Sequence, residues 1–476
     1  MVSNYTCRGA RMEKNTQLMD KTAQFGEGSV LKLMTRYSLP SILAMLAISA
    51  HSVINMTFVG RAVGPLGIAA IAVSGPVTMV QGSINQFISN GCAAAVSITL
   101  GQGDRDGAQR ILGTSTLFLF VVSIINIIIG FTFMEPLLAA FGASEATMAL
   151  AKDYMGITLI AMSYTCLATM NPMVRIEGFP KLAMVTMLLM TALNLILSPL
   201  FIFYFKWGIR GAALGTAIAQ FASSGWIFYF LLHRDRVVRL RFKYMRLKAS
   251  TMLLVMKLGL PTFLMQVTQS LLSVVMNRSL LAYGGDIAIS AFGITNNISN
   301  LISQPVFGLN QGAQPIIGYN FGANKISRVK QALVYSLAGA TMFSALGWLM
   351  TRFYAVPIFA FFNKDPSLIA VGSRMLIVFR MLIFVVGFQQ AGAAYFQYSG
   401  KPMVSVFLTL SRQVIFLIPL IVILPRFWQL NGILYAGPIS DLISTVLTAI
   451  FIVAELARLN GLIRESTRTA APDGAE

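Results

Sequence analysis

The chain has 476 residues, of which 56% are hydrophobic and 11% are charged, whereas soluble domains carry about 25% charged residues. Its 36 lysines and arginines outnumber its 17 aspartates and glutamates, which gives a formal net charge of +19. The high hydrophobic content and the low charged content exclude a water-soluble protein. Three cysteines and two histidines supply neither a disulfide framework nor a zinc site, and the sequence carries no nucleotide-binding or nucleophile motif. We therefore predict a membrane protein that is not an enzyme and uses no metal or cofactor.

Apolar segments long enough to cross a bilayer recur along the chain. A spanning helix needs about 20 mostly apolar residues, because its backbone groups find no water in the hydrocarbon core. Twelve such segments are predicted, which makes the fold an all-α membrane protein. Their ranges are 37–59, 68–98, 110–133, 150–173, 181–204, 210–232, 254–282, 288–318, 330–351, 368–396, 402–424 and 432–457.

Polar segments divide these spans into two groups of six. We predict an N-terminal tail at 1–36, an N-lobe at 37–232, a basic linker at 233–253, a C-lobe at 254–457 and a C-terminal tail at 458–476. The tail at 1–36 lacks the apolar core of a signal peptide, so no cleavage is expected. Most lysines and arginines fall on the side of both tails and the linker, and this asymmetry places both termini in the cytoplasm. The basic linker thus reports topology rather than binding of nucleic acid.

The two predicted lobes repeat each other in sequence. Gly64, Gly91 and Gly101 each return 221 positions later, as Gly285, Gly312 and Gly322. Because each repeat holds an even number of spans, the repeats are parallel and related by an axis along the membrane normal. Two six-helix lobes that face each other predict an alternating-access transporter. The alternative is a duplicated scaffold that does not transport.

Several dispersed strings resemble one transporter family. They are Thr-Phe-Val-Gly-Arg at 57–61, Glu-Gly-Phe-Pro-Lys-Leu-Ala-Met at 177–184, Gln-Pro-Ile-Ile-Gly-Tyr-Asn-Phe-Gly-Ala at 314–323, Ser-Arg-Gln-Val-Ile-Phe-Leu-Ile-Pro at 411–419 and Gly-Pro-Ile-Ser-Asp at 437–441. Together they resemble the multidrug and toxic compound extrusion (MATE) family, in its bacterial drug-efflux branch. The resemblance covers about residues 30 to 460. It implies export of organic cations or other amphipathic compounds across the bacterial cytoplasmic membrane, driven by inward flow of protons or sodium ions.

The N-lobe departs from the family pattern at two acidic positions. Where many bacterial members carry aspartates, this chain has Asn55 and Ser198, although the neutral positions Asn171, Asn194 and Thr216 match. A cation site built on carboxylates is therefore not expected there.

A histidine one helical turn before Asn55 offers a different possibility. His51 titrates near physiological pH and is a candidate proton carrier, and the alternative is a neutral histidine that hydrogen-bonds between helices.

The C-lobe holds the charges that fall inside predicted spans. Arg412 and Asp441 each lie about ten residues into antiparallel neighbouring helices, so we expect them to pair near the middle of the bilayer. Arg380 reaches a similar depth without an evident acidic partner. Asp441 is interpreted either as a coupling carboxylate or as half of a structural ion pair.

Amide side chains are unusually dense in three C-lobe spans. Because an amide that faces lipid stays unpaired, these residues are expected to line a cavity or to bond neighbouring helices. They include Gln266, Gln269, Asn296, Asn297, Asn300, Gln304, Asn310, Gln311, Gln314, Gln389, Gln390 and Gln397.

These features favour a secondary exporter of small organic molecules that acts as a monomer in the bilayer. The missing N-lobe carboxylates favour the proton over sodium as the coupling ion. One alternative is a flippase or exporter of a lipid-linked or anionic substrate, for which Arg278, Arg380 and Arg412 leave room. Another is a membrane receptor or scaffold that does not transport.

Overall fold

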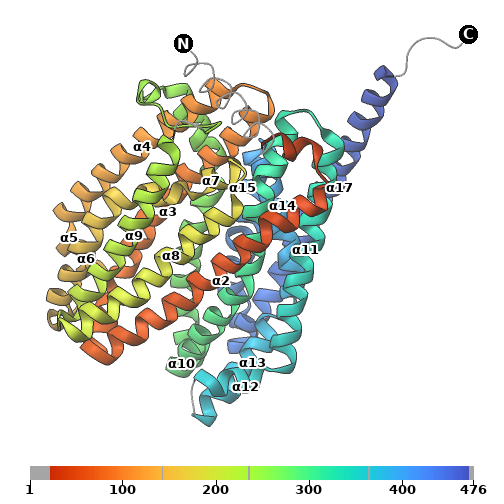
Figure 1. The fold of residues 1–476 in the computed structure, drawn as a ribbon. Helices are drawn as coiled ribbons and strands as arrows, with labels where there is room; N and C mark the ends of the chain where they lie inside the picture. Colours follow the sequence, from red (N-terminus) through yellow and green to blue (C-terminus); the bar gives the residue numbers. More distant parts are fainter. Residues whose placement is uncertain (1–21, 142, 234–235, 363–364, 471–476) are drawn as a thin grey trace, which may run out of the picture.

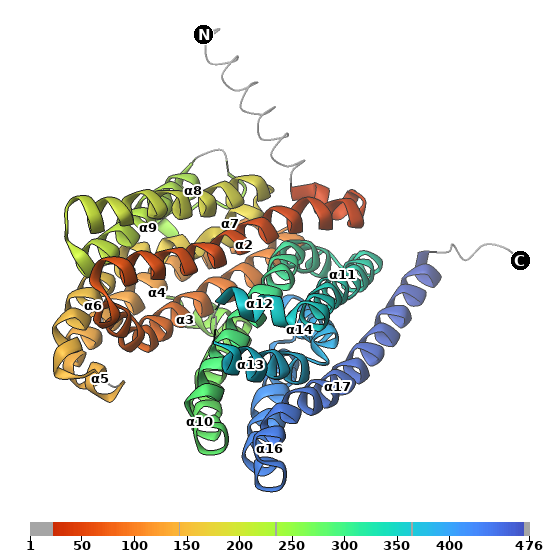
Figure 2. The same cartoon turned by 90° about the horizontal axis from the view of Figure 1, so that it is seen from below.

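The computed structural model describes residues 22–141, 143–233, 236–362 and 365–470, apart from the side chains at a few helical positions. Every regular element in this part of the chain is a helix. The first group comprises α2 (Val30–Val63), α3 (Pro65–Gly101), α4 (Arg105–Thr132), α5 (Met134–Ala140), α6 (Glu145–Thr165), α7 (Asn171–Ile176), α8 (Pro180–Pro199) and α9 (Gly208–Leu232). The second comprises α10 (Ala249–Gly322), α11 (Ile326–Phe353), α12 (Ala355–Phe362), α13 (Pro366–Phe379), α14 (Ile383–Tyr398), α15 (Pro402–Leu410), α16 (Ile418–Ile423) and α17 (Pro425–Ala470). These groups form two helical bundles that stand beside each other (Figures 1 and 2).

All twelve predicted spans fall on helical segments. Among the described residues, eight helices are long and apolar enough to cross a membrane, and two bent helix pairs raise the number to ten. One of these pairs is α13 with α14, whose axes differ by 50°. The other two spans, 68–98 and 288–318, lie in α3 and in the second part of α10. Both helices pack against the opposite lobe, and the second part of α10 also lines a cavity.

The sequence repeat is also present in the backbone. Gly64 separates α2 from α3 at φ 76° and ψ −164°, and Gly285 interrupts α10 at φ 64° and ψ −165°. This left-handed region of φ is open to glycine and strained for residues with a Cβ. The same turn thus joins the first two spans of each lobe. A second pair at equivalent turns, Gly178 and Gly400, also has positive φ, at 91° and 74°.

Glycines bring the two lobes into backbone contact at one end of the molecule. This end carries the first turn of α2, the loops between α3 and α4 and between α10 and α11, and the end of α17 (Figure 1). A Cβ on Gly91 would lie 2.9 Å from the amide nitrogen of Gly259, and one on Gly312 would lie 2.6 Å from the Cα of Ser38. Glycine is required here because neighbouring helices approach more closely than a methyl group permits.

The linker between the lobes is held onto the N-lobe at this same end. The Glu177 carboxylate, which is buried, accepts hydrogen bonds from the backbone amides of Val237 and Val238. Gln109 donates to the carbonyl oxygen of Val237 at 3.0 Å, and the Arg236 guanidinium lies over the Phe230 ring at 3.9 Å. The basic linker is therefore packed against the bundle through specific contacts.

The outward faces of the helices are apolar. Large hydrophobic side chains are exposed on one side of α4 and of α17, at Ile124, Ile128, Val446, Ile450 and Val453. Such faces suit lipid, because a soluble monomer rarely exposes large contiguous apolar surfaces.

Candidate functional site

Four of the predicted N-lobe residues form one hydrogen-bonded cluster between α2, α8 and α9. His51 Nε2 lies 2.7 Å from Asn194 Oδ1, which also accepts a hydrogen bond from the Ser198 hydroxyl at 3.0 Å. Asn194 Nδ2 in turn donates to Thr216 Oγ1 at 2.8 Å. With the amide in this orientation, His51 donates through Nε2. The cluster favours the interpretation of His51 as an interhelical hydrogen-bonding residue.

The other two predicted N-lobe residues are Asn55 and Asn171. Asn55 lies on α2, but its side chain is outside the described part of the chain. Asn171 begins α7, where its Nδ2 donates to the carbonyl oxygen of Ala183 at 3.1 Å and its Oδ1 accepts from Arg175 at 3.1 Å. A 3₁₀ segment, Cys166–Met170, interrupts the fourth span just before Asn171. The Asn171 side chain therefore hydrogen-bonds the first turn of α8, near the end at which the lobes meet.

The C-lobe contains a partly open cavity of about 320 Å³, which is within the usual range for small-molecule sites. All of its lining residues come from the C-lobe except Asn90, which reaches it from α3. Of the predicted C-lobe site residues, Gln304 on the second part of α10 is not part of the lining. Those that do line the cavity are Gln266, Gln269, Asn296, Asn300, Arg380, Arg412 and Asp441.

The rest of the lining combines further amides with aromatic rings. Asn310, Gln311, Gln314, Gln389, Gln390 and Gln397 line the cavity as predicted, whereas Asn297 does not. Sequence reasoning missed Asn90, Gln413 and the rings of Phe292, Phe307 and Phe379. Phenylalanine is common in lipid-facing and core positions alike, so the sequence holds no signal that sets these rings apart.

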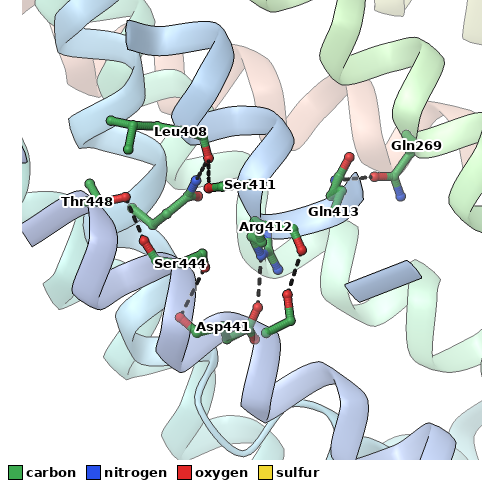
Figure 3. A network of polar contacts seen from close by, with 10 residues as sticks. Gln269, Leu408, Ser411, Arg412, Gln413, Asp441, Ser444 and Thr448 are labelled. Atoms are coloured by element: carbon green, nitrogen blue, oxygen red, sulfur yellow. Dashed lines mark hydrogen bonds and ion pairs between the residues drawn. The ribbon is translucent and has the colours of Figure 1, made fainter. Parts of the chain in front are cut away.

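The predicted ion pair is present in this cavity. Arg412 Nε lies 2.8 Å from Asp441 Oδ1, and the two side chains are 14% and 3% exposed. Arg412 belongs to a π-helical segment, Ser411–Leu417, whose widened turn leaves the Arg412 carbonyl oxygen free to accept the Ser440 hydroxyl. Figure 3 shows this pair beside Gln413, which donates to Gln269 at 3.0 Å.

The third charged residue of the cavity is placed differently. Arg380 caps the C-terminal end of α13, at the break before α14. Its guanidinium lies 5.0 Å from the Phe379 ring, and its buried Nε finds no hydrogen-bond partner among the described residues. The cavity therefore contains one paired arginine, one paired aspartate and, within the described structure, one arginine without a carboxylate.

Comparison with known proteins places these features in a family. The MatE family model matches residues 40–200 and 261–423, which is one match in each lobe. The chain is 28% identical over 422 residues to a protein of Shewanella oneidensis named FAD transporter, covering 87% of this chain and 92% of the relative. It is 24% identical over 420 residues to the multidrug export protein MepA of Staphylococcus aureus, covering 88% and 92%.

Solved structures agree with the fold. The structure of the MATE multidrug transporter DinF-BH is 31% identical, with a TM-score of 0.84 over 90% of this chain and 96% of that one. A transporter from Pyrococcus furiosus is 21% identical, with a TM-score of 0.87 over 92% and 98%, and it supports the fold alone. The paired matches to the family model and the shared fold show that this multi-pass membrane protein belongs to the MATE family.

Proposed function

We propose that the protein is a secondary active exporter of amphipathic organic compounds that works by alternating access. The observation that carries this proposal is the cavity in the C-lobe, which is lined by polar and charged side chains. The two lobes are also in backbone contact at one end of the molecule. Because the lobes are closed at that end, substrate would be released at the opposite end. The relatives named for multidrug export, and the one named FAD transporter, support transport of organic molecules.

The charge asymmetry supports an orientation with both termini in the cytoplasm of a bacterium. In this orientation the closed end faces the cytoplasm and the protein is an outward-facing exporter. We propose that it works as a monomer, because one chain contains both lobes and the cavity.

The proposed coupling ion is the proton. Two titratable groups are candidates for carrying it: Asp441 in the cavity and His51 in the N-lobe cluster. Because Asp441 is paired with Arg412, that pair must open when Asp441 takes up a proton. Sodium is less favoured, since it prefers several hard oxygen ligands.

Transport by purified protein in proteoliposomes tests the function. Uptake of a cationic dye and of an anionic dye is followed under an imposed pH gradient and, separately, an imposed sodium gradient. The proposal predicts movement driven by the pH gradient. Movement that ignores both gradients would remove the antiport mechanism, and pH-driven transport that survives Asp441→Asn would remove Asp441 from coupling.

A further inference from the structure

The charges around the C-lobe cavity do not balance. Arg380, Arg412 and Asp441 are the charged residues among its lining, so two positive charges and one negative charge give the cavity a formal charge of +1. Arg412 and Asp441 hold each other at 2.8 Å. The three charges act on one another, but within the described residues Arg380 alone of the three makes no direct ion pair.

The protein leaves this surplus charge available to a ligand. Within the described residues, the Arg380 side chain makes no ion pair, and its Nε is buried without a hydrogen-bond acceptor. Arg380 is partly exposed and lines the cavity, so an anion bound there could reach its guanidinium and compensate the charge that the buried Nε carries without a partner among these residues. The Phe379 ring, whose centroid lies 5.0 Å from the guanidinium carbon, supplies no opposing full charge.

The surroundings of Arg380 suit a particular shape of ligand. Phe292 packs edge-to-face on Phe379, with ring centroids 5.8 Å apart, and both line the cavity together with Phe307. Aromatic walls favour a flat ring system. Gln390, which also lines the cavity, adds an amide group that can donate to oxygen atoms.

We propose that Arg380 is a binding residue for an oxyanion group, a carboxylate or a phosphate, carried by an aromatic organic substrate. The guanidinium fork matches the two oxygen atoms of such a group, which is the geometry in which arginine binds most strongly. The ion pair with Arg412 keeps Asp441 from repelling the anion. This inference rests on the proposed export function and assigns it a substrate class.

Two dyes that share a xanthene ring but differ in charge provide the test. Binding of carboxyfluorescein, which is anionic, and of rhodamine 6G, which is cationic, is measured by fluorescence anisotropy on the purified full-length protein. The variants are Arg380→Gln and Arg380→Lys. The matched control is Arg374→Gln, which makes the same charge change on α13 at an exposed residue outside the cavity lining.

The wild-type protein should bind carboxyfluorescein more tightly than rhodamine 6G. Arg380→Gln should weaken carboxyfluorescein binding about tenfold or more and leave rhodamine 6G binding equal or tighter, while Arg374→Gln changes neither. Arg380→Lys keeps the positive charge but lacks the planar guanidinium, so it should lose an intermediate amount of carboxyfluorescein affinity. This variant still tests the inference if Arg380→Gln does not fold.

Two results would overturn the inference: equal carboxyfluorescein affinity in wild type and Arg380→Gln, or tighter wild-type binding of rhodamine 6G. Other results would contradict the proposed function without contradicting the anion site, and the reverse is also true. Gradient-driven transport of rhodamine 6G without carboxyfluorescein binding removes only the anion site, whereas carboxyfluorescein binding without gradient-driven transport of either dye removes only the antiport mechanism.

Discussion

Gly101 and Gly322 occupy equivalent places in the two lobes, and each packs against the backbone of the other lobe. A Cβ on Gly101 would stand 2.8 Å from the amide nitrogen of Ala323, and one on Gly322 would stand 2.8 Å from the carbonyl carbon of Ile98. The contact is thus reciprocal, as a two-fold relationship between the lobes requires. It closes the end of the molecule at which α3 ends and α11 begins.

Alanine at these two glycines should separate the lobes at this end. Because backbone rather than a flexible side chain occupies the space, Gly101→Ala and Gly322→Ala force the helices apart. We expect a longer distance between spin labels at Asp106 and Ser327, which are exposed on either side of the contact, and reduced transport. Double electron–electron resonance measures the distance.

Two glycines in open space on the same helices provide the controls for this prediction. Gly82→Ala on α3 and Gly293→Ala on α10 add the same methyl group without meeting a neighbour, so the label distance should not change. An unchanged distance in both Gly101→Ala and Gly322→Ala would contradict the role of these glycines in closing the lobes.

The sequence predicts the scaffold better than it predicts the cavity wall. The positive φ shared by Gly64 and Gly285 follows from a repeat that is visible in the sequence, and the Arg412–Asp441 pair follows from depth and charge. By contrast, the break that places Arg380 between α13 and α14 has no proline or glycine at the break itself to mark it. The side-chain direction of Asn171 depends on a local 3₁₀ turn, and sequence spacing alone does not determine such a turn.

Replacing one residue of the Arg412–Asp441 pair should destabilise the protein more than replacing both. Asp441→Asn leaves Arg412 buried without its counter-charge, at a cost of about 3–5 kcal/mol, whereas replacing both residues by apolar ones of similar volume should recover most of that loss. Thermal unfolding in detergent compares Asp441→Asn, Arg412→Met and the double variant Arg412→Met with Asp441→Leu. If Asp441→Asn unfolds at the wild-type temperature, the pair is not a structural element.

Asn194 is expected to be the most important member of the N-lobe cluster for stability. It bonds His51, Ser198 and Thr216, whereas Ser198 and Thr216 each make one bond to it. Asn194→Ala leaves the buried Ser198 hydroxyl without its acceptor and removes a partner from the half-buried His51 and Thr216, which should cost about 1–3 kcal/mol. Ser198→Ala should cost less, because Asn194 Oδ1 keeps His51 as a donor. Thermal unfolding of the two variants tests this order, and an equal or reversed effect would show that the cluster does not depend on Asn194.

Docking of the linker onto the N-lobe should weaken as pH rises. Burial raises the pKa of Glu177 from 4.5 to about 7, although the Val237 and Val238 amides and the charges of Arg236 and Arg105 oppose the shift. A carboxyl group whose pKa is raised by docking binds its proton more tightly in the docked state. Its contribution, on the order of 3 kcal/mol at most, is therefore complete below a pH of 4.5 and is lost as the pH rises through about 7.

Hydrogen exchange of the linker, corrected for the intrinsic pH dependence of exchange, measures this effect. In the wild type, the amides of Val237 and Val238 should be better protected at about pH 5.5 than at about pH 8. Glu177→Gln cannot ionise but still offers a carbonyl acceptor, so it should abolish the pH dependence and keep protection. Glu177→Ala leaves both amides without their acceptor and should lose protection at every pH, because an unpaired buried N–H favours opening. Protection that rises with pH in the wild type, or a pH dependence that persists in Glu177→Gln, would show that another group controls the linker.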